Sequence, residues 1–317
     1  MRVVAVDSGT TSTRAWVVDE GRVGAQASVR AGARDLVGGR GSDWLAGRVR
    51  EVAERALSEA QLSWEEVEAV VAFGMITSEL GLEELPHLKA PVDRQALAEG
   101  LEERAYPEHL PVPIFLVPGV RYEGDGAVAQ ADFMRGEETE VVGALEAGTA
   151  QPPFLLLSTG SHSKFVLVDP EGRIAWSFTT LSGELVWALH RETILAGLID
   201  PQAGLDHGQA VEEGSRVARE AGLSRALFVT RLLNRLEGVD PAACSAFVHG
   251  AVAESDLASL ERALPTGRPE EVVLTGSGAL ADSYRHLLEG REWVRRVRVV
   301  EHPLGAMGAW ALYAGRR

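Results

Sequence analysis

The chain has 317 residues, of which 45% are hydrophobic and 24% are charged, and its formal net charge is −15. This length suffices for two domains with hydrophobic cores, and this composition is typical of globular proteins. The negative charge argues against nucleic acid and anionic membrane surfaces as partners, because both attract basic proteins. The single cysteine, Cys244, excludes an internal disulfide and a cysteine-rich zinc site, and we interpret it as a small core residue.

The sequence also bears on the compartment in which the protein works. The N-terminus enters an apolar strand at once, without the basic region and apolar segment of a signal peptide. The longest apolar runs are far too short to span a bilayer. We therefore expect a cytoplasmic protein without a membrane partner.

The first stretch of the chain is predicted to form a β-hairpin. An apolar run at residues 3–6 indicates a strand buried on both faces, and the strand ends at Asp7. A turn rich in glycine, serine and threonine follows, before a second apolar run at residues 15–18. The turn offers backbone N–H groups and hydroxyls to phosphate oxygens, and the Asp7 carboxylate suits a hydrated Mg²⁺ ion. Taken alone, the stretch also fits an ordinary hairpin.

The next part of the chain alternates helices, strands and polar loops. Apolar residues recur at helical spacing after Ser42 and Asp43, which predicts a helix to about Leu62. Further predicted elements are a helix start at Ser63, a strand at 67–73, a helix from 93 to about 104, a strand at 114–117 and a helix ending near Leu145. The strand at 67–73 ends in Gly74 and Met75, which indicates a substrate loop or, equally, a simple strand-to-helix turn.

Acidic residues gather around the start of the last of these helices. Glu137 and Glu138 open it, and Asp132 precedes them. Acids favour helix N-termini for electrostatic reasons alone, which is one interpretation. The other is that one of them projects into a cleft as a base, with Arg135 pairing either with a substrate carboxylate or with the acids.

Residues 155–169 repeat the design of the first hairpin. The alignment sets Gly160 against Gly9 and Asp169 against Asp19, with one residue fewer in the second turn. An internal repeat at half the chain length predicts two similar lobes.

The boundary between the lobes is expected at Pro152-Pro153, which gives lobes of residues 1–151 and 152–317. Two such hairpins facing each other would grip a polyphosphate from both sides, which predicts a nucleotide site at an interlobe cleft. Lys164 lies beside the second turn, where it suits a phosphate contact or is a surface lysine flanking a turn.

The remaining elements are mostly helical. They are a strand at 174–178, a helix from Ser182 to about 197, a largely helical stretch at 206–264, a strand from 271, a strand at 297–300 and a helix at 303–315 rich in glycine and alanine. His190, His207 and His249 lack the spacing of metal ligands, so we interpret them as core or solvated residues.

A glycine turn follows the strand that begins at residue 271. If the two hairpins bind the phosphates of a nucleotide, Gly276 and Ser277 would lie against its adenosine. The segment also fits G-x-G-x-x-A, with Glu301 roughly 20 residues further on, as a dinucleotide-binding unit requires. That Rossmann interpretation leaves the duplicated hairpins unexplained, and the βα repeats it needs do not follow.

Three stretches resemble, in this order, the actin/hexokinase/Hsp70-like ATPase superfamily: residues 7–13, 158–164 and 274–279. Residues 134–140 (MRGEETE) and 159–164 (TGSHSK) are similar to signatures of the 2-dehydro-3-deoxygalactonokinase family. Other stretches that fit the family pattern are 12–16, Gly74-Met75, Pro118-Gly119 and 182–185. The resemblance covers nearly the whole chain. It departs at Ser8, where the family pattern has tryptophan, and at Ser158, where it has proline.

The resemblance implies an α/β, two-lobed actin-like (ribonuclease H-like) fold with duplicated β-hairpin-bearing domains and an interlobe cleft. It implies ATP-dependent phosphorylation of 2-dehydro-3-deoxy-D-galactonate at its 6-hydroxyl, in D-galactonate degradation, with ATP and Mg²⁺ as cofactors. Asp7 would hold Mg²⁺ through water. Glu137 would orient or deprotonate the 6-hydroxyl, with Glu138 or Asp132 as alternates.

The resemblance also implies which residues bind the two substrates. Those assigned to the nucleotide are Gly9, Thr10, Thr11, Thr159, Gly160, Ser161, Lys164, Gly276 and Ser277. An arginine partner is expected for the carboxylate of the sugar acid. The residues assigned to the sugar acid are Arg14, Arg34, Gly74, Met75 and Arg135.

Three alternatives stay open at this point. The chain could be a kinase of another small sugar or sugar acid, such as 2-dehydro-3-deoxygluconate, because one inverted hydroxyl cannot be read from a sequence. It could be a non-kinase ATPase of the same fold, or a nicotinamide-dependent oxidoreductase that uses the Gly276 turn. A homodimer is compatible with each.

Overall fold

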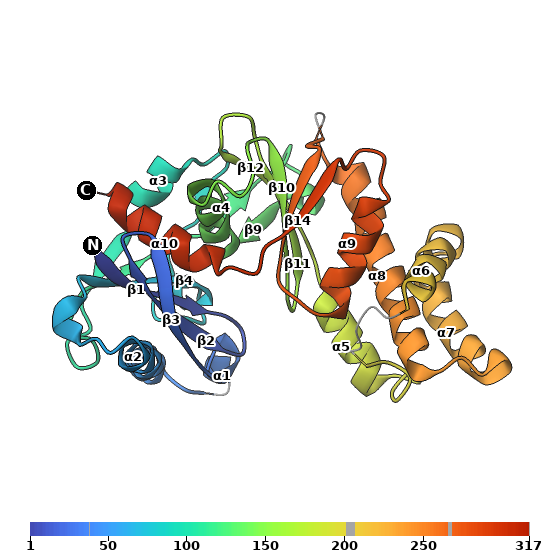
Figure 1. Cartoon of the computed structure of the whole chain (residues 1–317), viewed down its shortest axis with the longest axis horizontal. Coiled ribbons are helices and arrows are strands. Elements are labelled where there is room, and N and C mark those ends of the chain that lie inside the picture. The colour runs from blue at the N-terminus through green and yellow to red at the C-terminus, as the bar shows by residue number, and fades with distance from the viewer. Residues whose placement is uncertain (38, 201–206, 266–267, 317) are drawn as a thin grey trace. The chain divides into compact units, whose positions relative to one another are not determined.

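The computed structural model describes residues 1–37, 39–200, 207–265 and 268–316 and has a mixed α/β architecture (Figure 1). The chain separates into two compact units. The first comprises Met1–Pro152, Val168–Ser177 and the segment from His302 onward, and the second comprises Pro153–Leu167 and Phe178–Glu301. The segment from His302 onward therefore belongs to the same unit as the N-terminal strands.

A six-stranded sheet forms the core of the first unit. Its order is β3-β2-β1-β4-β7-β6. The strands are β1 (Arg2–Ser8), β2 (Thr13–Asp19), β3 (Arg22–Val29), β4 (Ala69–Gly74), β6 (Glu102–Arg104) and β7 (Ile114–Leu116). β1 and β2 form the predicted antiparallel hairpin, whereas β4 runs parallel to β1. The ends of β1 and β4 therefore lie side by side, with Ser8 opposite Gly74.

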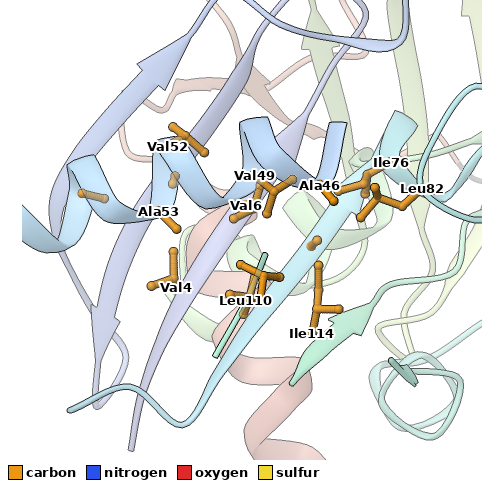
Figure 2. Close-up of a cluster of buried hydrophobic side chains, with 14 of the residues drawn as sticks. Val4, Val6, Ala46, Val49, Val52, Ala53, Ile76, Leu82, Leu110 and Ile114 are labelled. Atoms are coloured by element: carbon orange, nitrogen blue, oxygen red, sulfur yellow. The ribbon is translucent and has the colours of Figure 1, made fainter. Parts of the chain in front are cut away.

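Both faces of β1 are buried, which explains its uninterrupted apolar run. Successive side chains of a strand point to opposite faces. Val4 and Val6 pack against Val49 and the neighbouring residues of α2 (Ser42–Glu59) on one face (Figure 2). The helix α10 (Leu304–Gly315) also contacts β1 and packs on α4 (Glu137–Glu146). Glycine at positions 143 and 308 allows these two helices to pack closely. A Cβ at either Gly143 or Gly308 would overlap the backbone of the other helix.

Smaller elements complete the first unit. They are the sheet of β5 (Leu88–Lys89), β8 (Val120–Tyr122) and β9 (Asp132–Met134), the helices α1 (Ala33–Val37) and α3 (Arg94–Glu99), and the short 3₁₀ helices η1 (Trp64–Glu66), η2 (Met75–Thr77) and η3 (Val128–Gln130). β9 leads through Arg135 and Gly136 directly into α4. The small sheet therefore positions the N-terminus of α4.

A second sheet repeats the design of the first. Its order is β12-β11-β10-β13-β14. The strands are β10 (Phe154–Thr159), β11 (Ser163–Val168), β12 (Ile174–Thr180), β13 (Glu271–Thr275) and β14 (Arg296–Val299). In both sheets three sequential strands lie next to one another, and two parallel strands follow beside the first of them. This equivalence confirms the duplicated, hairpin-bearing fold that the sequence repeat predicts.

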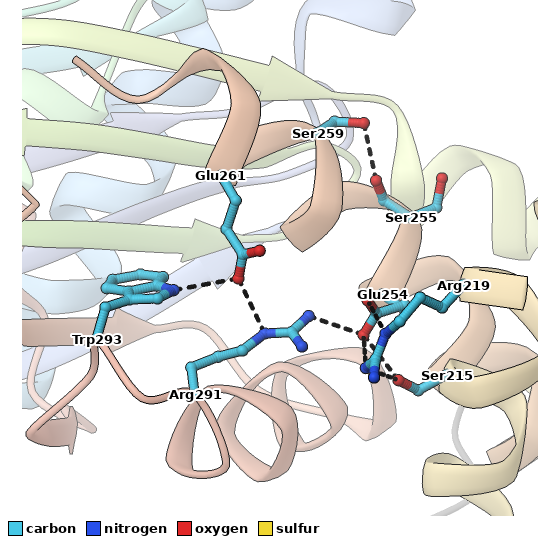
Figure 3. Close-up of polar contacts among 8 residues, drawn as sticks. All are labelled: Ser215, Arg219, Glu254, Ser255, Ser259, Glu261, Arg291 and Trp293. Carbon is cyan, nitrogen blue, oxygen red and sulfur yellow. Dashed lines mark hydrogen bonds and ion pairs between the residues drawn. The ribbon is translucent and has the colours of Figure 1, made fainter. Parts of the chain in front are cut away.

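The second unit also contains a group of helices. They are α5 (Ser182–Glu192), α6 (Gly208–Ala221), α7 (Leu223–Glu237), α8 (Pro241–Ala263) and α9 (Ala279–Glu289). Glu254 of α8 is 2% exposed and accepts hydrogen bonds from Ser215, Arg219 and Arg291 (Figure 3). Burial opposes ionisation, but these bonds and the two arginine charges hold the pKa of Glu254 below its usual range. The carboxylate thus joins α6 and α8 to the segment after α9.

Two predicted helices are shorter in the structure. The helix predicted from 93 to 104 is wrong beyond Glu99, where α3 ends, because residues 102–104 form β6 and pair with β7 at the sheet edge. That pairing satisfies backbone groups that a helix would otherwise satisfy internally. The helix predicted to residue 197 ends at Glu192, since Thr193 is extended. Within the described residues, no helix is both long and apolar enough to cross a bilayer.

Candidate active site

Asp7 lies near the end of β1, directly across the hairpin from Arg14. The Arg14 guanidinium donates to the Asp7 carboxylate at 2.5 Å. Burial raises the pKa of Asp7, Arg14 opposes that rise, and the negative charge of Glu137 adds to it, with a raised pKa as the net result. The carboxylate of Asp7 therefore interacts with the cation of Arg14 in the same hairpin and with the negative charge of Glu137.

Gly74 brings β4 against this carboxylate. Its backbone has φ of +85°, and a Cβ there would lie 2.8 Å from the Ser8 carbonyl oxygen and 3.1 Å from Oδ1 of Asp7. Only glycine combines this conformation with this close approach. The chain then turns into η2, and the Thr77 hydroxyl donates to the Gly74 carbonyl at 3.2 Å. The predicted loop at Gly74 and Met75 is thus packed beside Asp7.

The N-terminus of α4 meets the same place. A Cβ at Gly136 would lie 3.5 Å from the Cα atom of Gly74. Of the two acids that follow, Glu138 is 0% exposed, and both of its carboxylate oxygens accept from the Gly136 N–H at 2.8 Å. The Thr139 hydroxyl also donates to it, at 3.1 Å. Glu138 therefore closes the start of α4, whereas the charge of Glu137 acts on Asp7.

Glu138 should make the stability of the protein depend on pH. Burial, together with the charge of Glu137, raises the pKa of Glu138 from 4.5 to about 7. Between these values the folded state binds the proton more tightly than the unfolded state, so stability falls as pH rises from about 4.5 to 7. The shift corresponds to about 3 kcal/mol.

We expect Glu138→Gln to abolish most of this pH dependence, because a neutral amide has no ionisation to lose. Urea unfolding of both proteins at pH 5 and pH 8 measures it: the variant should gain on the wild type by about 2–3 kcal/mol between the two. An equal response of both proteins to pH would show that Glu138 is not the group responsible.

Arg135 is engaged by the protein itself. Its guanidinium donates to the Thr77 hydroxyl at 3.0 Å and to the Leu85 carbonyl at 2.6 Å. His87 lies 3.5 Å from the same guanidinium and stacks edge-on against Phe133. Arg135 therefore fixes the segment after Gly74 to the end of β9, next to the acids of α4.

The turn of the first hairpin, residues 9–12, is held from outside by the start of α1. Because the sequence predicts that it binds phosphate, we name it the first phosphate loop. The loop closes on itself, with the Gly9 N–H donating to the Ser12 carbonyl at 2.9 Å. The N–H groups of Ala33 and Arg34 donate to the carbonyls of Gly9 and Thr10 at 3.1 and 2.9 Å. Because the loop carbonyls are held by α1, the loop keeps a fixed shape.

The turn of the second hairpin, residues 160–162, is held in an equivalent way by the start of α5. It is likewise predicted to bind phosphate, and we name it the second phosphate loop. The Gly160 N–H donates to the His162 carbonyl at 2.9 Å, and the Glu184 N–H donates to the Ser161 carbonyl at 2.8 Å. Gly183 presses against the Gly160 carbonyl, so a Cβ there would overlap it.

Gly32 and Gly183 occupy equivalent positions in the two copies, since the spacing from Gly9 to Gly32 equals that from Gly160 to Gly183. Sequence reasoning gave neither residue a role, although Gly183 lies in the stretch 182–185 that fits the family pattern. Extending the alignment of the repeat past the third strand of each copy would have found them.

Gly32→Ala should disorder the first phosphate loop. A Cβ at Gly32 would lie 2.6 Å from the Gly9 carbonyl oxygen and from the carbonyl group of Thr10. We expect a loss of about 1–3 kcal/mol of stability and, in the folded protein, at least tenfold weaker nucleotide binding by titration calorimetry. Gly41→Ala is the control, because a Cβ there meets nothing within 4 Å. Unchanged nucleotide affinity in Gly32→Ala would contradict the role given to this loop.

The Gly276 turn packs on the same sheet end as the second loop. Gly276 has φ of +93°, and a Cβ there would overlap Thr159. The Thr159 hydroxyl donates to the Thr275 carbonyl at 3.0 Å, and Ser277 is exposed at the turn. Lys164, by contrast, is only 7% exposed in β11. The second unit therefore brings Thr159, Gly160, Ser161 and the Gly276 turn together.

The donor set suits a magnesium ion. Mg²⁺ is commonly held by one or two carboxylates together with water and substrate phosphates. Asp7 supplies one such carboxylate, with Glu137 close enough to raise its pKa. Among the described residues no group of three or more histidine, cysteine, aspartate and glutamate side chains could hold a metal, so protein ligands alone do not form a cage. Asp7 would therefore hold a hydrated Mg²⁺ ion through water.

Several solved structures share the fold of this chain. A candidate 2-dehydro-3-deoxygalactonokinase from Sinorhizobium meliloti is 24% identical, with 99% of this chain and 97% of that chain covered and a TM-score of 0.75. The ligand-bound xylulose kinase from Lactobacillus acidophilus is 13% identical, with 99% and 89% covered and a TM-score of 0.57. The activator of 2-hydroxyisocaproyl-CoA dehydratase from Clostridium difficile, with bound ADPNP, is 14% identical, with 99% and 94% covered and a TM-score of 0.55. The chain thus has the fold of the actin/hexokinase-like ATPases.

A family model assigns the chain more narrowly than the shared fold does. The family model for 2-keto-3-deoxy-galactonokinase matches residues 7–312, and the chain belongs to this family. It is accordingly a sugar-acid kinase, a phosphotransferase with an alcohol group as acceptor. The comparison with curated proteins gave no match. Membership of a kinase family confirms the resemblance seen in the sequence and removes the nicotinamide-dependent alternative.

Proposed function

We propose that this chain transfers the γ-phosphoryl group of ATP to the 6-hydroxyl of 2-dehydro-3-deoxy-D-galactonate in D-galactonate degradation. The observation that carries the proposal is the meeting of Asp7, Gly74 and the N-terminus of α4 in a chain of this family. Because the reaction consumes ATP, we place it in the cytoplasm.

Glu137 is the proposed base. Phosphoryl transfer depends mainly on positioning and on neutralising charge, so the protein must orient the acceptor hydroxyl and hold the phosphates. Glu138 is already occupied by the Gly136 N–H, and Asp132 lies at the far end of β9, paired with Tyr122. Glu137 is the acid next to Asp7, and its carboxylate would accept the proton of the 6-hydroxyl.

Asp7 would hold the magnesium ion of MgATP through water. That ion would neutralise charge on the phosphates. Arg14 keeps Asp7 in place across the hairpin by a hydrogen bond to its carboxylate. The Arg14 guanidinium would also attract an anionic substrate.

The nucleotide contacts are proposed for three segments. Gly9, Thr10 and Thr11 would bind phosphate oxygens through backbone N–H groups and hydroxyls, as would Thr159, Gly160 and Ser161. Lys164 would add a positive charge from β11. Gly276 and Ser277 would contact the adenosine. The fixed shapes of the two loops support these roles.

The sugar-acid contacts are proposed for the residues around Gly74 and Met75. Arg14 and Arg34 would pair with the substrate carboxylate. Arg135 would shape the pocket rather than bind the carboxylate directly, since its guanidinium already holds Thr77 and Leu85.

The deciding assay is ADP release with MgATP in four reactions: 2-dehydro-3-deoxygalactonate, its gluconate epimer, a neutral hexose and no acceptor. Turnover with the first substrate alone supports the proposal, and phosphorus NMR of the product should show a 6-phosphate. Faster turnover of the gluconate epimer would reassign the substrate. Equal release in every reaction would indicate an acceptor-independent ATPase and refute the kinase.

A further inference from the structure

Helix α8 carries a second buried acid, Asp256, two residues after Glu254. It is 8% exposed, and its Oδ2 atom accepts hydrogen bonds from three hydroxyls. Thr180 donates at 2.7 Å, and Ser182 and Tyr284 donate to the same oxygen. Burial raises the pKa of Asp256, and the three hydroxyl donors oppose that rise.

The three hydroxyls come from three different elements. Thr180 ends β12, Ser182 begins α5, and Tyr284 lies in the middle of α9. Tyr284 is fully buried and packs edge-on against Phe165 of β11, with ring centroids 5.9 Å apart. One carboxylate oxygen therefore gathers the ends of a strand and a helix and the interior of a second helix.

Two of these elements adjoin the segments proposed to bind the nucleotide: α5 packs on the second phosphate loop, and α9 follows the Gly276 turn. Ser182 is followed at once by Gly183, which presses on Gly160, and by Glu184, whose N–H holds Ser161. Tyr284 lies on α9, which begins directly after the Gly276 turn. Asp256 is thus linked to the second phosphate loop through α5 and to the Gly276 turn through α9.

We propose that Asp256 is a positioning residue for nucleotide binding, which fixes the second phosphate loop and the Gly276 turn relative to each other from behind. This rests on the proposed nucleotide role of those two segments. A carboxylate suits the task because hydrogen bonds to an ionised acceptor are shorter and about twice as strong as neutral ones. Without the carboxylate, three buried hydroxyls would lose their shared hydrogen-bond acceptor, which costs free energy. We expect α5 and α9 to shift so that these hydroxyls find other partners.

Glu254 provides a matched control on the same helix. It is also buried, at 2% exposed, but its partners are Ser215, Arg219 and Arg291 (Figure 3), which lie on α6 and after α9 rather than in either nucleotide segment. Loss of Glu254 should therefore lower stability without moving the phosphate loop.

The test compares Asp256→Ala, Asp256→Asn and Glu254→Gln in the whole chain. Calorimetric titration of the free protein with ATP and, separately, with the sugar acid gives the two dissociation constants, and melting temperatures give stability. We expect Asp256→Ala to weaken ATP binding by about tenfold while sugar-acid binding changes by less than about twofold. Asp256→Asn keeps one acceptor oxygen and should recover part of the loss. Glu254→Gln should melt earlier and bind ATP as the wild type does.

Wild-type ATP affinity in folded Asp256→Ala would overturn the proposal, as would an equal loss of ATP affinity in Glu254→Gln. If Asp256→Ala does not fold, Ser182→Ala and Tyr284→Phe each remove one hydroxyl. Ser182→Ala should weaken the binding of ATP but not that of adenosine, and Tyr284→Phe should weaken the binding of both ligands. No effect of either on ATP would overturn the proposal. Failure of the wild type to bind ATP would instead refute the proposed function.

Discussion

Replacing Glu137 by glutamine is expected to lower kcat for phosphoryl transfer by about a hundredfold to a thousandfold, because the amide cannot accept the proton of the acceptor hydroxyl. The dissociation constants of ATP and of the sugar acid should change by less than about threefold, since glutamine keeps the size of the side chain and its hydrogen-bonding oxygen. Steady-state kinetics with calorimetric titration of both substrates separates these quantities.

The same substitution has a second, independent readout. The charge of Glu137 raises the pKa values of both Asp7 and Glu138. Its removal should lower the pKa of Glu138 and move the pH-dependent loss of stability to a lower pH. Glu146→Gln is the control. Glu146 lies at the C-terminal end of the same helix, where it pairs with Arg94 at 2.6 Å. Near-normal turnover in folded Glu137→Gln would remove the base assignment.

Replacing Asp7 by asparagine is expected to lower kcat/KM by about a hundredfold or more and to raise the magnesium concentration needed for half-maximal activity. Stability should not fall. Burial makes ionised Asp7 costly to the fold, as its raised pKa indicates, and a neutral side chain of the same shape removes that cost. A melting curve beside a magnesium titration of activity tests both statements.

The first hairpin offers its own control for this change. Arg2 pairs with Asp19 at 2.6 Å across the opposite end of the same two strands, as Arg14 does with Asp7. Asp19→Asn therefore breaks a similar ion pair at a distance from Gly74 and α4. If Asp19→Asn and Asp7→Asn reduced activity equally, the effect would belong to the hairpin and not to a magnesium ligand.

The two hairpins were predictable from local pattern. Uninterrupted apolar runs, glycine-bearing turns and the repeat of this design specify strand, turn and strand wherever the segment is placed, since they depend on side-chain period and turn chemistry. The order of both sheets agrees with this prediction. The short strand β6 was not predictable, because residues 102–104 become a strand only by pairing with β7.

Neighbouring residues in the candidate site divide in a way that no pattern reveals. Glu137 and Glu138 are adjacent, but successive positions on a helix differ by about 100°, so one turns into the protein to the Gly136 N–H while the other acts on Asp7. Arg135 was predicted to pair with a substrate carboxylate or with the acids. In the structure its guanidinium donates to Thr77 and Leu85, which are far from it in the chain and which no local pattern indicates.

Local spacing predicted most of the strands, turns and helices and the duplication, and the resemblance of several motifs indicated the family to which the chain belongs. Packing of the whole chain sets which acid raises the pKa of Asp7, which glycines press on the phosphate loops, and which hydroxyls donate to Asp256. These are contacts between residues distant in sequence, and their geometry exists only after the sheets and helices have packed.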